Sequence, residues 1–121
     1  MKEKNFTEIM KSVDKAKLCL KIIQERKAVQ PMLLNVKKLT SITDYFLITS
    51  GSSTRQVQAI ARHLQKELRD VGYRPLGMEG EQEGKWVLLD YDDVVIHIFY
   101  QPVREFYNLE GLWAEATEVS L

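Results

Sequence analysis

The chain has 121 residues, of which 45% are hydrophobic and 28% charged, with 17 basic residues balanced by 17 acidic ones. This length allows one modest hydrophobic core, so we expect a single domain over 1–121, with an ordered part of about 5–113 and a frayed tail over 114–121. Balanced charge argues against a general nucleic-acid binder, whose surface is strongly basic. The charge is uneven, because residues 1–38 hold ten Lys or Arg and four Asp or Glu (+6), whereas 39–121 hold seven and thirteen (−6). The acidic part favours a basic partner.

The start of the chain and its cysteine content predict a cytoplasmic protein that does not enter a membrane. Met1–Lys4 lacks the apolar stretch of a secretory signal, and no apolar run approaches the ~20 residues of a membrane-spanning helix. Cys19 has no second cysteine to pair with inside the chain, which fits a reducing compartment.

The first predicted element is an amphipathic helix over about 5–27. Apolar residues recur there every three or four positions, Asn5 is placed as its N-cap, and Glu8 lies three residues further on. The other side of this helix is basic, and we expect it to be a solvated face that carries Lys11, Lys15 and Lys21.

Two strands and a second helix are predicted next. Pro31 ends the connection, and residues 32–36 and 45–49 have the composition of strands separated by a polar turn. Small polar residues then lead into a helix whose apolar positions run from 57 to 71, and Gly72 is placed to end it.

The last third of the chain is predicted to be mostly strand. Residues 75–84 combine a proline with glycines and acids, which indicates a short edge strand and a loop. Residues 85–89 and 94–100 are strong strand candidates joined by a hairpin connection, and a helical turn follows from Pro102 to about Tyr107.

This order of elements predicts an α+β fold, namely a mixed β-sheet of about five strands flanked by helices. The helix after the second strand permits a parallel pairing of strands two and three by a right-handed crossover, whereas the late hairpin must be antiparallel.

One feature is enzyme-like. Gly51-Ser52 at a strand-to-helix junction, taken with Asp90 and Asp92, matches the phosphate turn and Mg²⁺ carboxylates that nucleotidyltransferases use. The simpler interpretation is an N-capped turn and a solvated hairpin. No Lys or Arg lies within 50–54 to neutralise a triphosphate. We therefore predict that the chain is not an enzyme, with Mg²⁺-dependent nucleotidyl transfer as the alternative.

The histidines do not indicate a metal site. His97 lies in the middle of a strong strand, and a hydrogen-bonded structural role is favoured because no other His or Cys is near it in sequence. His63 falls on the polar side of the second helix and is expected to be exposed. With Cys19 on a core-facing side, we expect no cofactor, no zinc site and no Cys/His nucleophile pair.

The residues that remain point to protein binding. Aromatic side chains anchor many interfaces, and carboxylates around them steer a basic partner, although such rings also complete small cores. The C-terminal part gathers both kinds of residue: Glu79, Glu81, Glu83, Trp86, Asp90, Tyr91, Asp92, Asp93, Phe106, Tyr107 and Trp113.

Four blocks stand in a recognisable order along the chain: Asp44–Ser53, Arg55–Val57 with Ala59–Ala61, the spaced residues from Trp86 to Phe99, and the closing residues Arg104, Phe106, Tyr107, Leu109, Glu110, Leu112 and Trp113. Together they resemble the Iojap-like family of ribosomal silencing factors, and the resemblance extends from the first helix to Trp113. Asp92 stands where that family usually has glycine, and Asp tolerates a left-handed turn conformation better than most residues.

The resemblance implies an α+β fold similar to that of nucleotidyltransferases, without implying their activity. It also implies a repressor that docks on the large ribosomal subunit through its fourteenth ribosomal protein and blocks subunit joining when nutrients are scarce. A basic ribosomal protein suits the acidic part of this chain, so we expect little or no direct contact with nucleic acid. A mixed sheet with a free edge would also permit a homodimer.

Carried onto single residues, the resemblance leads us to place the ribosomal contact at the late hairpin. Alternation puts Trp86 and Leu88 on one strand face as apolar contacts. Tyr91 is expected to pack at the hairpin tip, and Asp90 and Asp93 are expected to pair with Lys or Arg of the partner. The weaker candidates are His97, Tyr107 and Trp113; the last two border this surface or close the core.

Overall fold

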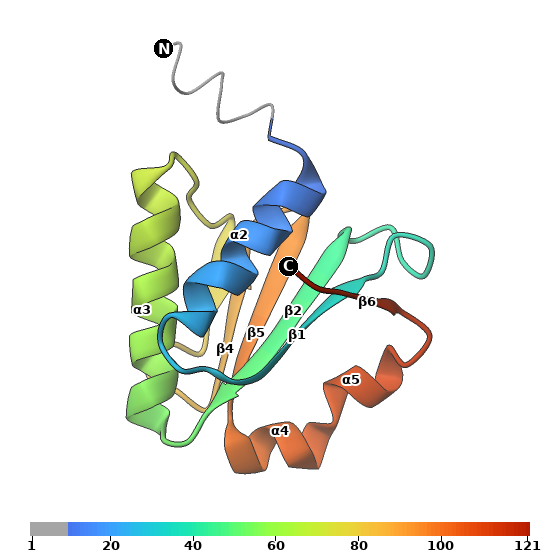
Figure 1. Ribbon diagram of the computed structural model, residues 1–121. Helices are drawn as coiled ribbons and strands as arrows, with labels where there is room; N and C mark the ends of the chain where they lie inside the picture. The colour runs from blue at the N-terminus through green and yellow to red at the C-terminus, as the bar shows by residue number, and fades with distance from the viewer. Residues whose placement is uncertain (1–9) are drawn as a thin grey trace.

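The computed structural model describes residues 10–121, which form a six-stranded mixed sheet with helices packed on both faces (Figure 1). This confirms the predicted α+β class and adds one strand to the expected sheet. The elements are α2 (Ser12–Gln24), β1 (Val29–Asn35), β2 (Tyr45–Gly51), α3 (Thr54–Asp70), β3 (Gly77–Glu79), β4 (Trp86–Asp90), β5 (Val94–Tyr100), α4 (Gln101–Tyr107), α5 (Leu109–Leu112) and β6 (Thr117–Val119).

The strand order is β3-β4-β5-β2-β1-β6, with β2 and β5 parallel and every other neighbouring pair antiparallel. The central strands β2 and β5 are buried along almost their whole length because helices cover both faces there. The parallel partner of β2 is β5, so the parallel pairing that the sequence permits between strands two and three is formed with a later strand instead. The third strand in sequence, β3, lies at the sheet edge, where all three of its residues are exposed.

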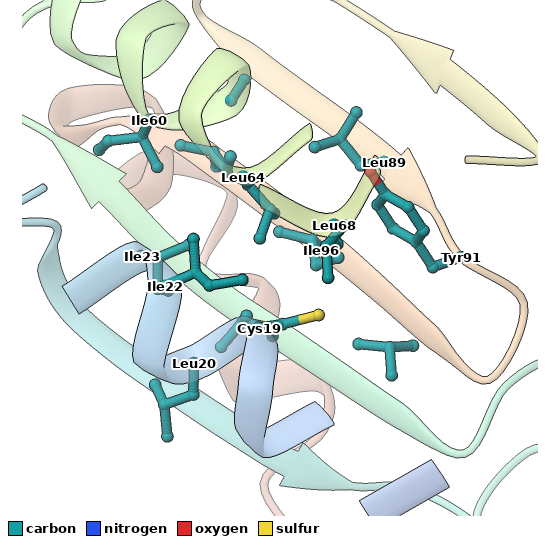
Figure 2. Packing of buried hydrophobic residues seen from close by; sticks show 14 of the residues in the cluster. Cys19, Leu20, Ile22, Ile23, Ile60, Leu64, Leu68, Leu89, Tyr91 and Ile96 are labelled. Atoms are coloured by element: carbon teal, nitrogen blue, oxygen red, sulfur yellow. The ribbon is translucent and has the colours of Figure 1, made fainter. Parts of the chain in front are cut away.

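Helices α2 and α3 lie side by side on one face of the sheet and enclose the main core (Figure 2). The apolar stripe predicted for α3 is buried from Val57 to Leu68, but its last predicted member, Val71, lies past the end of the helix and is 41% exposed. Ser53 caps this helix by accepting a hydrogen bond from the Gln56 amide at 3.0 Å, and Gly72 follows its end with a φ of 98°. Cys19 is buried in the same core, as predicted.

The first helix and first strand differ from their predicted limits. Helix α2 begins at Ser12, so Met10 does not belong to it, while the N-cap predicted at Asn5 lies outside the described residues. Strand β1 begins at Val29 and includes Pro31 in a bulge where the register with β2 shifts. A bulge leaves one residue unpaired, which is how a strand tolerates a proline without a donor.

The C-terminal tail is not frayed as expected. After α5, residues Thr117–Val119 form β6, which pairs antiparallel with β1 and places Val119 opposite Leu33. The backbone of β1 would otherwise present an unpaired edge, and three residues suffice to cover part of it. Such a short strand has no periodicity that the sequence could reveal.

The second face of the sheet carries a smaller apolar cluster that includes Leu34, Phe46, Val95 and Phe99. Helices α4 and α5 lie across one end of this face (Figure 1), and the Trp113 side chain packs against the same cluster. The cover is incomplete at β4, and this incomplete cover sets the position of the candidate site. Within residues 10–121 no helix has the length and apolar character needed to span a membrane.

Candidate partner-binding face

An aromatic cluster stands where α4 ends against β4. We call it the aromatic face and define it as Trp86, Leu88, His97, Phe106 and Tyr107. The Trp86 ring lies 5.0 Å from that of Tyr107, and the Phe106 and Tyr107 rings are 5.1 Å apart and nearly perpendicular. Phe106 is 80% exposed and Tyr107 is 53% exposed. Large aromatic side chains left this open are the usual anchors of a protein interface.

The buried side of the aromatic face is fixed by His97. Its Nδ1 accepts a hydrogen bond from Trp86 Nε1 at 3.1 Å, and its ring packs edge-on against Phe46 at 5.4 Å. Burial lowers the pKa of His97 to about 4, so the ring is neutral near pH 7 and its Nδ1 remains an acceptor. His97 is therefore hydrogen-bonded inside the protein, and it orients Trp86.

Acidic residues border the aromatic face along β3 and β4. Asp90 is on the same side of β4 as Trp86 and Leu88 by strand alternation, and Glu79 is the register partner of Leu88 on exposed β3. The Asp90 Oδ1 atom accepts the Asp92 amide at 2.8 Å, which leaves its second oxygen for other contacts. These carboxylates give the aromatic face a negative border.

Two predicted contact residues do not belong to this face. The Tyr91 side chain is 2% exposed and packs in the core beneath α2 and α3 (Figure 2). Burial also raises the pKa of Tyr91. Asp93 is bound on the helical side by Lys15, whose Nζ lies 2.8 Å from Asp93 Oδ1. The prediction that Tyr91 packs at the hairpin tip is therefore wrong, and Asp93 already has a basic partner inside the chain.

Lys15 was also predicted incorrectly, because it is 8% exposed rather than solvated. Its ammonium donates a hydrogen bond to the Tyr91 carbonyl at 2.8 Å and lies 4.4 Å from the centre of the Tyr73 ring. A buried cation with a carboxylate, a carbonyl and an aromatic ring around it is well compensated. His63, expected to be exposed, is likewise partly buried and lies 3.0 Å from Glu25 Oε1.

Arg104 in α4 was not singled out as a site residue, yet it fastens the aromatic face to the sheet. It is 4% exposed and donates to the Val29 carbonyl, Ser50 Oγ and Glu110 Oε2 at 3.1, 3.1 and 3.0 Å. The sequence signal was weak, since a lone arginine in a short helix is usually solvated. Phe106 was also left out of the contact residues, although it is the most exposed aromatic side chain of the face.

The nucleotidyltransferase alternative is contradicted by the strand register. Gly51 pairs with Tyr100 at one end of β5, whereas Asp90 pairs with Val95 near the other end. Five residues of strand separate these positions, which is about 17 Å at ~3.3 Å per residue. A phosphate turn and its metal carboxylates cannot act together across that distance.

The Gly51-Ser52 turn has its own structural role. A Cβ added at Gly51 would lie 3.1 Å from the backbone nitrogen of Val57, so the glycine allows α3 to pack closely. The amide and hydroxyl of Ser52 both donate to Gln56 Oε1, at 2.6 and 2.9 Å. The Gly51-Ser52 turn therefore serves as the start of α3. No group of three or more His, Cys, Asp or Glu able to hold a metal occurs among residues 10–121.

Helices α2 and α3 cover one face of the mixed sheet, α4 and α5 cover only part of the other, and the aromatic face is open beside them. Gly51-Ser52 and Asp90 lie at opposite ends of β5, so this arrangement favours a binding protein over a nucleotidyltransferase. Comparisons with known proteins show which family of binding proteins the chain belongs to. A family model described as "Ribosomal silencing factor during starvation" matches residues 9–121. The chain belongs to the ribosomal silencing factor family, and as such it is a ribosome-binding regulator of translation without enzymatic activity.

Individual relatives agree with the family match. A ribosomal silencing factor of Halalkalibacterium halodurans is 40% identical over 112 residues, covering 93% of this chain and 96% of the relative. The Bacillus subtilis factor is 39% identical over 100 residues, covering 83% and 85%. A crystal structure of a Chromobacterium violaceum protein superimposes with a TM-score of 0.84 at 34% identity, covering 93% of this chain and 92% of that one. These matches confirm the resemblance seen in the sequence.

Proposed function

We propose that the aromatic face docks on the fourteenth protein of the large ribosomal subunit, and that the bound chain prevents the small subunit from joining. Translation would then fall when nutrients are scarce, and the protein would act in the cytoplasm. The observation that carries this proposal is the cluster of Trp86, Phe106 and Tyr107, which lies open beside a partly covered sheet.

The chemistry of the face fits a basic protein partner. The exposed rings supply apolar area, and Glu79 and Asp90 lie further along β3 and β4, next to Leu88, where they could meet Lys or Arg. His97 holds the Trp86 ring through a hydrogen bond, so less side-chain freedom is lost when a partner binds. Tyr91 and Asp93 are left out of this contact, since both are engaged on the other side of the sheet.

Self-association stays a prediction. The β3 edge presents unpaired backbone groups that a second copy could use. Sedimentation of the pure protein at several concentrations would decide it, and a monomer at the concentrations where subunit joining is blocked would exclude a role for a dimer.

The test of docking uses Phe106→Ala with Ile42→Ala as its matched control. Phe106 and Ile42 are 80% and 79% exposed, so each substitution removes a large apolar side chain at little expected loss of stability. If Phe106 anchors the contact, its loss should weaken binding to the isolated large subunit by about 2 kcal/mol, roughly thirtyfold. Ile42→Ala should bind like the parent protein.

A second pair of measurements separates anchoring from steering. Asp90→Lys should slow association at low salt more than at high salt, because a border charge acts mainly on encounter. In a subunit-joining assay, the double variant Phe106→Ala, Asp90→Lys should let subunits join where the parent holds them apart. If this folded double variant still blocks joining as well as the parent, the aromatic face is not the docking surface.

A further inference from the structure

Charge in this molecule is separated between its layers. Residues 11–27, which comprise α2 and the turn after it, hold six basic and two acidic residues, and α3 over 54–70 holds four and two. The two helices therefore carry a net charge of +6. The remaining described segments, 28–53 and 71–121, hold five basic and eleven acidic residues, or −6. In a neutral chain, the basic excess therefore lies in α2, α3 and the turn after α2, and the acidic excess lies in the sheet, its loops, α4 and α5.

The outer side of the α2–α3 layer carries basic side chains that form no ion pair with another residue of 10–121. We define the basic face as Lys21, Arg26, Lys27, Arg55, Arg62 and Arg69, all of which are exposed. Among residues 10–121, none of these six side chains makes an ion pair, whereas Lys15 and Lys66 do. Exposed cations without carboxylate partners are available to an external anion.

The geometry of the basic face is a row with a cluster at one end. Arg55, Arg62 and Arg69 are spaced by seven residues, so they lie on one side of α3 at intervals of about 10 Å. The end of α2 meets the start of α3, because Gln56 Nε2 donates to the Lys27 carbonyl at 3.3 Å. Lys27 therefore lies near the start of α3, at the Arg55 end of the row, and α2 packs beside α3 (Figure 1).

We propose that the basic face is a second docking surface, and that it binds the phosphate backbone of an RNA helix. Guanidinium groups pair with phosphates in a planar, two-pronged geometry, and a regular row of them suits a regular polyanion. A membrane surface fits less well, because binding helices insert large apolar side chains, and the exposed large apolar residues include none from α2 or α3. On a ribosome such RNA would be met beside the docked protein.

The test measures binding of the full chain to a labelled RNA duplex of about 20 base pairs by fluorescence anisotropy across a salt series. The parent should bind, and its affinity should fall with salt with a log–log slope of about −2 to −4 for a few phosphate contacts. Arg55→Glu, Arg62→Glu should weaken binding at least about tenfold at low salt and flatten the slope by about two. The matched control Lys37→Glu, Lys38→Glu changes net charge equally on the β1–β2 loop and should retain most of the affinity.

Three outcomes would overturn this inference: no binding by the parent at low salt, equal losses in both double variants, or binding to anionic lipid vesicles but not to RNA. If the basic face bound an acidic protein but not the duplex, RNA would likewise be rejected as its ligand. Failure of this RNA-binding test can be told apart from failure of the proposed docking on the ribosomal protein. The Arg55→Glu, Arg62→Glu variant should still bind the isolated ribosomal protein, whereas Phe106→Ala should lose that contact and keep RNA binding.

Discussion

The buried imidazole of His97 makes stability of the aromatic face sensitive to pH. His97 is 6% exposed, and its Nδ1 accepts the Trp86 indole N–H at 3.1 Å. Burial lowers the pKa of His97 from 6.5 to about 4. Above pH 6.5 the ring is neutral in both the folded and the unfolded chain. Between these two pKa values the unfolded chain binds a proton that the folded chain does not, so stability falls as pH falls.

The expected loss follows from the two pKa values. A separation of about 2.5 pH units corresponds to about 3 kcal/mol once pH is below 4, and about 2 kcal/mol of this is already lost at about pH 5. That is a sizeable part of the total stability of a small domain. Protonation of Nδ1 would also remove the acceptor of the Trp86 hydrogen bond. The Trp86 ring, which belongs to the proposed docking surface, would then lose its fixed orientation.

The assay compares the parent with His97→Phe, which keeps a flat ring but cannot titrate. Free energies of unfolding by urea at about pH 7.5, 6, 5 and 4.5 would be measured for both proteins. All other ionisable groups are the same in both proteins, so the difference between the two curves isolates His97. We expect the variant to gain about 2 kcal/mol relative to the parent between pH 7.5 and 5. Parallel curves over this range would refute the reasoning.

Two further predictions concern the turn of the β4–β5 hairpin and the ion pair between α4 and α5. Asp92 has a φ of 77°, so Asp92→Gly should relieve the left-handed strain and raise stability by up to about 1 kcal/mol, measured as the thermal midpoint; an unchanged or lower midpoint would contradict it. Arg104→Met should cost about 3 kcal/mol because it leaves the Glu110 carboxylate without its cation, and adding Glu110→Leu should recover most of the loss in a double-mutant cycle. Additive losses would show that the pair is not coupled.

The regular elements could be predicted because their patterns are local. The period of the α3 stripe, the Ser53 cap and the Gly72 stop are all set by neighbours in sequence, and the hairpin between β4 and β5 is set by its turn residues. Strand β6 could not be found this way, because its only reason to be extended is the open edge of β1, far away in the chain. The parallel pairing of β2 with β5 was not predicted either, again because the two strands are far apart in the chain.

The candidate site was only partly predictable. Alternation correctly placed Trp86 with Leu88, and the structure adds the Tyr107 ring to the same cluster. Tyr91 continues the other set of alternating positions, after Val87 and Leu89, and its side chain enters the same core as theirs. The period-two pattern therefore indicates its burial, and the prediction of a contact at the hairpin tip did not apply the pattern to this residue. Lys15 was missed because its partner Asp93 is distant in sequence.

The arrangement of the aromatic face depends on two buried polar side chains, Arg104 outside it and His97 within it. Tyr107 reaches Trp86 only because α4 is fastened to the sheet, and Arg104 supplies that fastening by bridging Val29 and Ser50 of two different strands. An apolar side chain in place of Arg104 could fill the same volume with comparable stability. It would, however, allow α4 to shift and rotate on the sheet. Directional bonds fix both the position and the angle of α4. The rings of α4 therefore meet Trp86, itself oriented by His97, in one arrangement built before any partner arrives.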